Sequence, residues 1–390
     1  MLKATKVRLY PTLEQAAFLN AQFGAVRFVY NKALHIISTQ YKRHGTQLRA
    51  KKDLKLLLAV AKKSRKYPWL KDYDSMALQQ ACINLDRAFQ NFFDPKLPAR
   101  YPRFKRKHGK QSSYHCTGIK VGEGAIKIPK LTPIKARIHR DITGTLKSIT
   151  LTRTTTGKYY ASVLVDDGEE APAPLQTVDA VLGVDMGLTH LAIDSEGNKT
   201  ANPRFLKQAR ANLRRKQKAL SRCQKGSKGR AKARLKLAKA HERLANTRAD
   251  FQHKLSRQLI DDNQAVVVET LKVKNMLKNR KLAKHIADAS WHSLIQKLAY
   301  KADAQGKHLV KIDQWFASTK TCAGCGHKVD KMPLSIRTWD CPGCGIQGID
   351  RDVNAALNIR QQGIIKLRAE GLSVPANGGM RQSGHASVAA

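Results

Sequence analysis

One stretch of the chain, residues 319–360, limits the possible folds most because its cysteine spacing suits few local structures. Cys322-x-x-Cys325 is followed by fifteen residues and then by Cys341-x-x-Cys344. Each pair places two thiolates on one tight turn, and two such turns can close a tetrahedral four-thiolate site that suits zinc. Two disulfides or four unrelated thiols are the alternatives, but paired knuckles at this spacing favour zinc. With four protein ligands, the ion would be structural.

Net charge is the strongest signal of the whole composition. The 390 residues include 72 Lys and Arg against 29 Asp and Glu, a formal net charge of +43, and the cations are spread along the whole chain. Such self-repulsion opposes compaction unless a polyanion neutralises it. We therefore expect an extended nucleic-acid surface, long enough for a large RNA as well as DNA. A generally soluble basic protein is the weaker alternative.

The compartment can be predicted from what the sequence lacks. No apolar run is long enough to span a membrane, and residues 1–20 do not have the pattern of a signal peptide. No basic amphipathic helix with an exposed apolar face or lipidation signal favours a membrane surface. Cys82, Cys116 and Cys223 are scattered, which fits a reducing compartment. We therefore expect an intracellular protein.

The first half of the chain shows two kinds of periodicity. Apolar residues alternate over residues 3–10 and again over 114–165, where the second hairpin turns near 155–158. Between them, residues 12–93 read as helices; in the last of these, Cys82 lies on the apolar stripe and is expected in the core. These patterns predict a small antiparallel barrel interrupted by helices. The proline-containing segment that follows residue 166 reads as a linker between domains.

A basic loop at residues 94–110 places Tyr101 and Phe104 beside Lys105. Aromatic rings among cations suit base stacking next to phosphate contacts, while local packing of the rings is an equal alternative. Further along, residues 203–260 read as two basic helical arms broken at 225–230. Their cationic faces could line a duplex, or they could form a solvated charged hairpin.

Three acidic residues stand at the ends of predicted elements. Asp185 ends the first apolar strand of a hairpin, and Glu269 ends a continuous apolar run typical of a strand buried on both faces. Asp352 opens the last helix. Each has an ordinary alternative as a turn residue, a salt-bridged glutamate or a helix cap. Together they could hold two divalent ions about 3.5–4 Å apart, the arrangement used for phosphodiester hydrolysis. Mg²⁺ suits such carboxylates.

The order of these motifs resembles the TnpB (OrfB) proteins of insertion sequences, which are relatives of type V CRISPR effectors. The resemblance runs from about residue 3 to residue 365 and is specific from Asp185 onward. The matching segments are GVDMG around Asp185, HERLANTRADFQHKLS from His241, VVVETLKVKNM around Glu269, STKTCAGCG from Ser318, WDCPGCG from Trp339 and DRDVNAALNI from Asp350, with VRLYPT, VYNKAL and YPRFK nearer the N-terminus. One departure is Ile349, where many relatives have histidine.

The resemblance implies a multidomain α+β protein. It implies a RuvC nuclease domain of RNase H-like α/β fold (169–318 and 346–366) with an inserted zinc ribbon that binds target nucleic acid (319–345). It also implies an N-terminal wedge-like β-barrel (1–11 and 112–168) with an inserted helical recognition domain (12–111). Residues 367–390 are expected to be a disordered tail because they are rich in Gly, Ser and Ala.

The resemblance also implies the activity: RNA-guided cleavage of double-stranded DNA next to a short flanking motif, with a guide RNA from the transposon end. The family's metal-binding carboxylates fall on Asp185, Glu269 and Asp352, with Asp350 as a cap or neighbour. Further nucleic-acid contacts are expected from Tyr101, Phe104, Lys105, Lys320 and Arg351. The oligomeric state is left open.

Three other functions compete with this one. A nuclease-silent, RNA-guided repressor would not need an intact carboxylate set. An RNA-independent transposase or resolvase would need its own terminal-sequence recognition domain, and no clear helix-turn-helix is evident in the sequence. A non-enzymatic zinc-ribbon binder would explain the cysteines and the charge but not Glu269.

Overall fold

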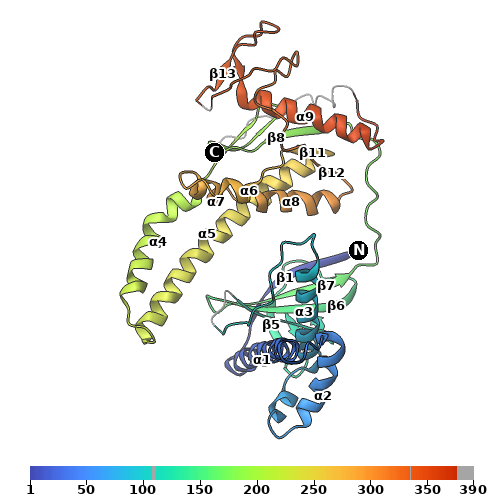
Figure 1. Cartoon of the computed structure of the whole chain (residues 1–390), viewed down its shortest axis with the longest axis vertical. Helices are drawn as coiled ribbons and strands as arrows, with labels where there is room; N and C mark the ends of the chain where they lie inside the picture. The colour runs from blue at the N-terminus through green and yellow to red at the C-terminus, as the bar shows by residue number, and fades with distance from the viewer. Residues whose placement is uncertain (108–110, 334, 376–390) are drawn as a thin grey trace. The chain divides into compact units, whose positions relative to one another are not determined.

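The computed structural model describes residues 1–107, 111–333 and 335–375, which form two compact units that divide between Glu170 and Ala171 (Figure 1). The division falls within the segment whose prolines predict a linker. Each unit has its own hydrophobic core, the first built from residues 7–165 and the second from two clusters on either side of a sheet.

The first unit is built on a seven-stranded antiparallel sheet with the order β2-β6-β7-β1-β5-β4-β3. The strands are β1 (Leu2–Tyr10), β2 (Gln111–Cys116), β3 (Lys120–Gly122), β4 (Ala125–Lys127), β5 (Ile134–Arg137), β6 (Thr145–Thr154) and β7 (Tyr159–Asp166). The predicted hairpin is confirmed, because β6 and β7 pair across a turn in which Gly157 has a φ of 80°. The pairings establish an antiparallel sheet, and its closure into a barrel stays a prediction.

Helices of the first unit pack on this sheet. They are α1 (Leu13–His44), the π-helical turn η1 (Ala50–Leu54), α2 (Lys55–Lys63), the 3₁₀ turn η2 (Pro68–Asp72) and α3 (Ser75–Phe93). A capping box of Thr12 and Gln15 starts α1, and the Asp74 side chain caps α3. Cys82 of α3 is buried in the core, as its position on the apolar stripe predicts.

The second unit has a five-stranded sheet with the order β10-β9-β8-β11-β12. Its strands are β8 (Val181–Asp185), β9 (His190–Asp194), β10 (Lys199–Ala201), β11 (Ala265–Val268) and β12 (His308–Lys311). β8, β11 and β12 are parallel, whereas β9 and β10 continue the sheet antiparallel. The fully buried apolar run of β11 matches the expected strand with two covered faces.

Helices cover both faces of this second sheet. Val266 and Val268 of β11 face a cluster that contains residues of α5 (Lys228–Asp261) and α8 (Trp291–Asp303), among them Leu259 and Leu298. Ala265 and Val267 of β11 face the other cluster. To this cluster α9 (Arg351–Ala369) contributes Ile359, Ile364 and Leu367. The result is a three-layer α/β arrangement. α4 (Phe205–Arg222) packs against α5 as a helical hairpin, broken at residues 223–227 (Figure 1).

The remaining elements of the second unit are short. α6 (Val273–Met276) and α7 (Ala283–Ala289) join β11 to α8. The two-stranded ribbon of β13 (Thr338–Trp339) and β14 (Ile349–Asp350) lies between β12 and α9 in sequence. None of the helices in the described part of the chain has an apolar stretch that could cross a bilayer.

The prediction that a disordered tail begins at residue 367 is wrong for residues 367–375. α9 continues to Ala369, Leu367 and Val374 are buried, and Ser373 pairs with Thr177. These residues are ordered because they complete the apolar cluster under α9. The rest of the expected tail, residues 376–390, lies outside the described residues.

Candidate carboxylate site and cysteine centre

The three predicted carboxylates belong to three elements of the second unit. Asp185 is the last residue of β8, Glu269 directly follows β11, and Asp352 lies in the first turn of α9. In the parallel pair of β8 and β11, Val184 is in register with Val268. Asp185 and Glu269 therefore leave the same carboxyl edge of the sheet, where sheets of this kind bind ligands.

Electrostatics show that the three carboxylates influence one another. Burial, as the largest cause, and the negative charges of Glu269 and Asp352 together raise the pKa of Asp185 to about 7, while Arg351 opposes the rise. Among the described residues, only the four cysteines form a group of three or more His, Cys, Asp or Glu side chains whose ligand atoms all lie within 4.8 Å of one another. The carboxylates are thus close enough to repel but less tightly gathered than the thiols.

Asp352 is held between two arginines. The Arg351 guanidinium donates to Asp352 Oδ1 from Nε at 3.1 Å and from Nη2 at 2.9 Å. Arg337, just before β13, donates to Asp352 Oδ2 at 3.2 Å. Arg351 is only 6% exposed, so it neutralises the carboxylate from inside the protein rather than facing solvent. This placement does not support the prediction that Arg351 contacts nucleic acid.

Glu269 has a partner that the sequence did not reveal. Ser318 Oγ donates to Glu269 Oε1 at 2.5 Å, and the Ser318 carbonyl accepts from the Asn358 side chain of α9 at 2.8 Å. Both Ser318 and Asn358 are buried. A chain of hydrogen bonds therefore joins Glu269, the segment after β12 and the helix that carries Asp352. The one feature of the sequence that could have drawn attention to Ser318 is its place in the Ser-Thr-Lys triplet just before the first cysteine pair.

Asp350 is the helix cap that we expected. Its Oδ1 accepts from the backbone N–H groups of Asp352 and Val353, both at 3.0 Å, and its other oxygen pairs with Lys199 at 2.5 Å. An acceptor at this position satisfies free N–H groups of the first turn. Asp350 thus fixes the start of α9, which sets the position of Asp352.

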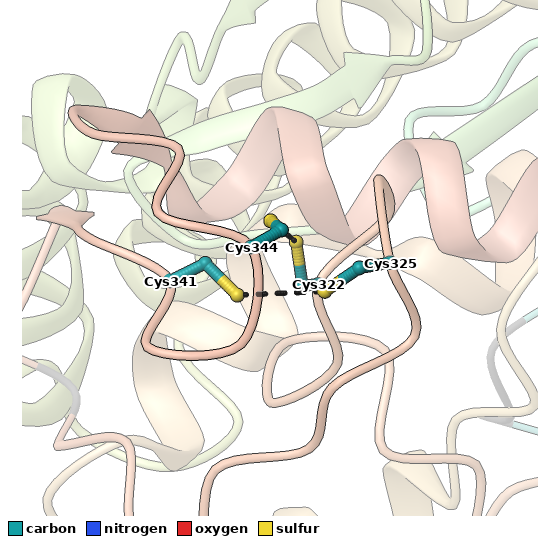
Figure 2. Close-up of side chains that lie close together, drawn as sticks. All are labelled: Cys322, Cys325, Cys341 and Cys344. Atoms are coloured by element: carbon teal, nitrogen blue, oxygen red, sulfur yellow. Dashed lines mark hydrogen bonds between the residues drawn. The ribbon is translucent and has the colours of Figure 1, made fainter.

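The cysteine knuckles form one compact site (Figure 2). Cys322 and Cys344 sulfurs are 3.9 Å apart, and those of Cys325 and Cys341 are 3.6 Å apart. Zinc–sulfur bonds of about 2.3 Å in a tetrahedron require sulfurs roughly 3.8 Å apart, so the spacing fits zinc. Burial opposes ionisation of Cys341, but N–H groups of Cys344 and Gly343 lower its pKa to about 6.

Both knuckles have the same backbone pattern. The N–H of Gly326 donates to the Cys322 carbonyl, and the N–H of Gly345 donates to the Cys341 carbonyl, each at 2.9 Å. Asn354 of α9 ties the first knuckle to the sheet unit, because its side chain accepts from Ala323 N at 2.8 Å and donates to the Thr321 carbonyl at 2.7 Å. Asn354 therefore attaches the cysteine ribbon to α9.

The remaining predicted contact residues have mixed placements. Tyr101 is exposed, yet its ring packs edge-on against Phe89 and Phe92. Lys105 Nζ lies 4.0 Å from the centroid of the Tyr30 ring, and burial lowers the pKa of Lys105. Phe104 is exposed, and Lys320 Nζ donates to the Asp330 carbonyl at 2.8 Å. Tyr101 and Phe104 thus remain available to a partner.

Comparison with known proteins places the chain among related sequences. Family models described as "Probable transposase", "Cas12f1-like, TNB domain" and "Helix-turn-helix domain" match residues 162–280, 291–359 and 1–46. The last match covers β1 and the single helix α1, ending just beyond it, rather than two helices joined by a turn.

Two curated relatives are similar over nearly their whole length. A "Putative RNA-guided DNA endonuclease" of Streptomyces pristinaespiralis is 41% identical, covering 93% of this chain and 89% of the relative. A protein of Escherichia coli K12, "Putative RNA-guided DNA endonuclease InsQ", is 31% identical, covering 98% and 96%. A solved Cas12f1 complex with sgRNA and target DNA shares the fold, with a TM-score of 0.53 at 14% identity over 90% of this chain and 83% of that one.

Proposed function

Because the chain belongs to the TnpB (OrfB) family, we propose that it is an RNA-guided endonuclease that cleaves double-stranded DNA next to a short flanking motif. The relatives that cover nearly the whole chain are named for that activity. The single observation that carries the proposal is the mutual influence of Asp185, Glu269 and Asp352 at one edge of the sheet. A guided repressor would have no use for these repelling carboxylates.

The second unit is proposed to be a RuvC nuclease domain of RNase H-like fold. Three antiparallel strands, β10, β9 and β8, followed by the parallel strands β11 and β12, suit that assignment. The zinc ribbon interrupts this domain before α9 and is proposed to engage the target. In the first unit, the sheet corresponds to the wedge-like barrel, and α1 to α3 correspond to the recognition helices.

The carboxylate site has the ligand chemistry that Mg²⁺ prefers. Asp185, Glu269 and Asp352 offer hard oxygen ligands, and a divalent cation would offset the repulsion that raises the pKa of Asp185. We propose that these residues hold two Mg²⁺ ions, which would activate the attacking water and stabilise the leaving oxygen. Ser318 orients the Glu269 carboxylate, and Asp350 fixes the helix turn that presents Asp352.

The cysteine centre is proposed to hold a structural zinc ion. The residues Cys322, Cys325, Cys341 and Cys344 would fill all four positions, which would leave no open position for chemistry. The small cluster of Trp339, Val329 and Met332 around the sulfurs is too limited to hold the ribbon alone. Zinc would therefore supply much of the ribbon's stability.

Guide RNA from the transposon end is proposed to bind the cationic surface of the first unit. Lys6 and Arg8 of β1 lie over the Tyr160 ring, at 4.6 and 5.0 Å from its centroid. Arg8 is in register with Arg137 of β5, so cations continue across neighbouring strands. Cations interleaved with an aromatic ring suit a nucleic-acid backbone and its bases. In the cell, the complex would be cytoplasmic and associated with the nucleoid when bound to DNA.

Sequencing the RNA that purifies with the protein tests this proposal. We expect one discrete RNA species that contains a variable segment, and plasmids that match this segment beside the correct flanking motif should be cleaved. Random cellular RNA, or no cleavage of any matching plasmid in a library of flanking sequences, would contradict the proposal.

A further inference from the structure

One tryptophan of the second unit is placed unusually for its size. Trp315 lies in the segment between β12 and the first cysteine knuckle, and it is 81% exposed, whereas Trp291 and Trp339 of the same unit are buried. Exposing an indole forfeits one of the largest gains in apolar burial available to a side chain. A partner that covers the ring would recover it.

The segment around Trp315 is anchored, so a loose loop does not explain the exposure. Asp313 Oδ1 accepts from the Trp315 backbone N–H at 2.7 Å, which closes a local turn. Phe316 packs on the apolar cluster under α9, and Ser318 is buried against Glu269. The backbone on both sides is therefore fixed while the indole points into solvent.

The position of this ring relative to the carboxylates follows from two connections. Lys272 comes three residues after Glu269, and Trp315 comes three residues before Ser318, the hydrogen-bond partner of Glu269. Lys272 Nζ lies 5.7 Å from the centroid of the Trp315 ring. The segment after Glu269 thus contributes the cation, Lys272, and the segment before Ser318 contributes the exposed aromatic ring, Trp315.

We propose that Trp315 stacks on a base of the DNA strand whose phosphodiester enters the carboxylate site, while Lys272 contacts the phosphate beside that base. This inference rests on the proposed nuclease function and adds a positioning residue to it. Every base has a π face, so stacking on an indole holds a strand without reading its sequence. A guided nuclease must cut whatever sequence the guide selects, which is the property such a contact gives.

Photocrosslinking tests the contact directly. The Asp185→Ala protein with its RNA is bound to target DNA in which 5-iododeoxyuridine replaces single thymidines near the cut, in either strand. We expect a crosslink at one or two adjacent positions, in a peptide that contains Trp315, and its loss in Trp315→Ala. Tyr300→Ala, which removes another exposed aromatic ring of this unit, should leave the crosslink in place.

Cleavage kinetics provide the second measurement. Trp315→Ala in the active protein should slow single-turnover cleavage by roughly 5- to 150-fold, the effect of losing one base–aromatic stack, with unchanged RNA binding and thermal unfolding. Trp315→Phe should restore most of the rate. Lys272→Gln should slow cleavage and make the rate less dependent on salt, because one phosphate contact is lost. Wild-type rates for Trp315→Ala, or a crosslink that never reaches this segment, would overturn the inference while Asp185→Ala remains inactive. A wild-type complex that does not cleave DNA would instead contradict the proposed function.

Discussion

Gly183 of β8 lies against the backbone of Ala356 in α9 so closely that no side chain would fit between them. A methyl group on Gly183 would overlap the Ala356 carbonyl oxygen and would lie 2.6 Å from the backbone nitrogen of Arg360. Gly363, further along α9, approaches β11 in the same way, since its added Cβ would lie 2.9 Å from Cβ of Val267. Two glycines thus let the helix that carries Asp352 lie directly on the strands that lead to Asp185 and Glu269.

The close contact predicts that Gly183→Ala is damaging. The added methyl must push α9 away from the sheet, because its nearest neighbours are backbone atoms that cannot rotate aside. Overpacking of this kind costs about 1–3 kcal/mol in the free energy of unfolding, and the displaced Asp352 should also slow DNA cleavage. Denaturant titration and cleavage assays on the same preparation measure both effects.

Gly229→Ala is the matched control for that substitution. Gly229 lies near the start of α5, and the nearest atom to an added Cβ is Ser227 Oγ at 3.8 Å. Alanine should therefore be neutral, or stabilising by up to about 1 kcal/mol through its helix propensity. Equal stability of both alanine variants would show that α9 does not depend on the close approach at Gly183.

Ser318→Ala should impair cleavage without unfolding the protein. It removes the only side-chain donor to Glu269 among the described residues and leaves a partly buried carboxylate less well oriented. A hydrogen bond to a charged group is worth about 1.5–3 kcal/mol, so we expect roughly a tenfold or larger loss of rate. Single-turnover cleavage measures it. Ser221→Ala, which removes an exposed hydroxyl of α4, should cleave like the wild type.

Cys322→Ser should remove zinc and weaken target engagement. The variant replaces one sulfur of the four-thiolate site, so the metal content should fall from about one ion per chain toward zero. Atomic absorption and DNA-binding assays check this, with Cys223→Ser in the helical hairpin as the control. A Cys322→Ser protein with a full complement of zinc and undiminished activity would contradict the proposed zinc site.

Two buried thiols predict a loss of stability at alkaline pH. Burial raises the pKa of Cys82 to about 11 and that of Cys116 to about 12. The folded state holds these protons more tightly than the unfolded state, whose thiols ionise near pH 9. Their contribution is therefore complete below pH 9 and is lost as the pH rises through the two folded values.

Unfolding titrations from pH 8 to pH 11 measure this loss. Cys116→Ala should have a smaller decline in the free energy of unfolding over that range than the wild type, even though its starting value is lower. Both thiols should also resist alkylation in the native protein at pH 8. Rapid modification of Cys82 or Cys116 under those conditions would show that the first core is open.

The extent to which the sequence predicted the fold depends on how local each signal is. The apolar run before Glu269, the cap at Asp350 and the paired knuckles are set by neighbouring residues, and the structure contains all three. Strands β8 and β11 of the second sheet are marked in the same way by buried apolar residues, whereas the edge strand β10 is not. The predictions that the structure does not support concern contacts between residues that are distant in the chain. Arg351 looks like a surface cation in sequence, and only the fold buries it beside Asp352.

The same reason explains the ordered segment after α9 and the partner of Glu269. Residues 370–375 show no helical or strand periodicity in the sequence, but Val374 packs in an apolar cluster that the sequence does not reveal. Ser318 reaches Glu269 across 49 positions of sequence. Periodicity and spacing describe faces of single elements, whereas these contacts arise when elements pack together.

The central claim is that Asp185, Glu269 and Asp352 act together in cutting DNA, and one assay tests it most directly. Purified wild-type and Asp185→Ala proteins, each with the same bound RNA, are incubated with matching plasmid DNA and Mg²⁺. We predict linear product from the wild type, none above background from Asp185→Ala, and equal RNA and DNA binding by both. Cleavage by Asp185→Ala at the wild-type rate would contradict the account.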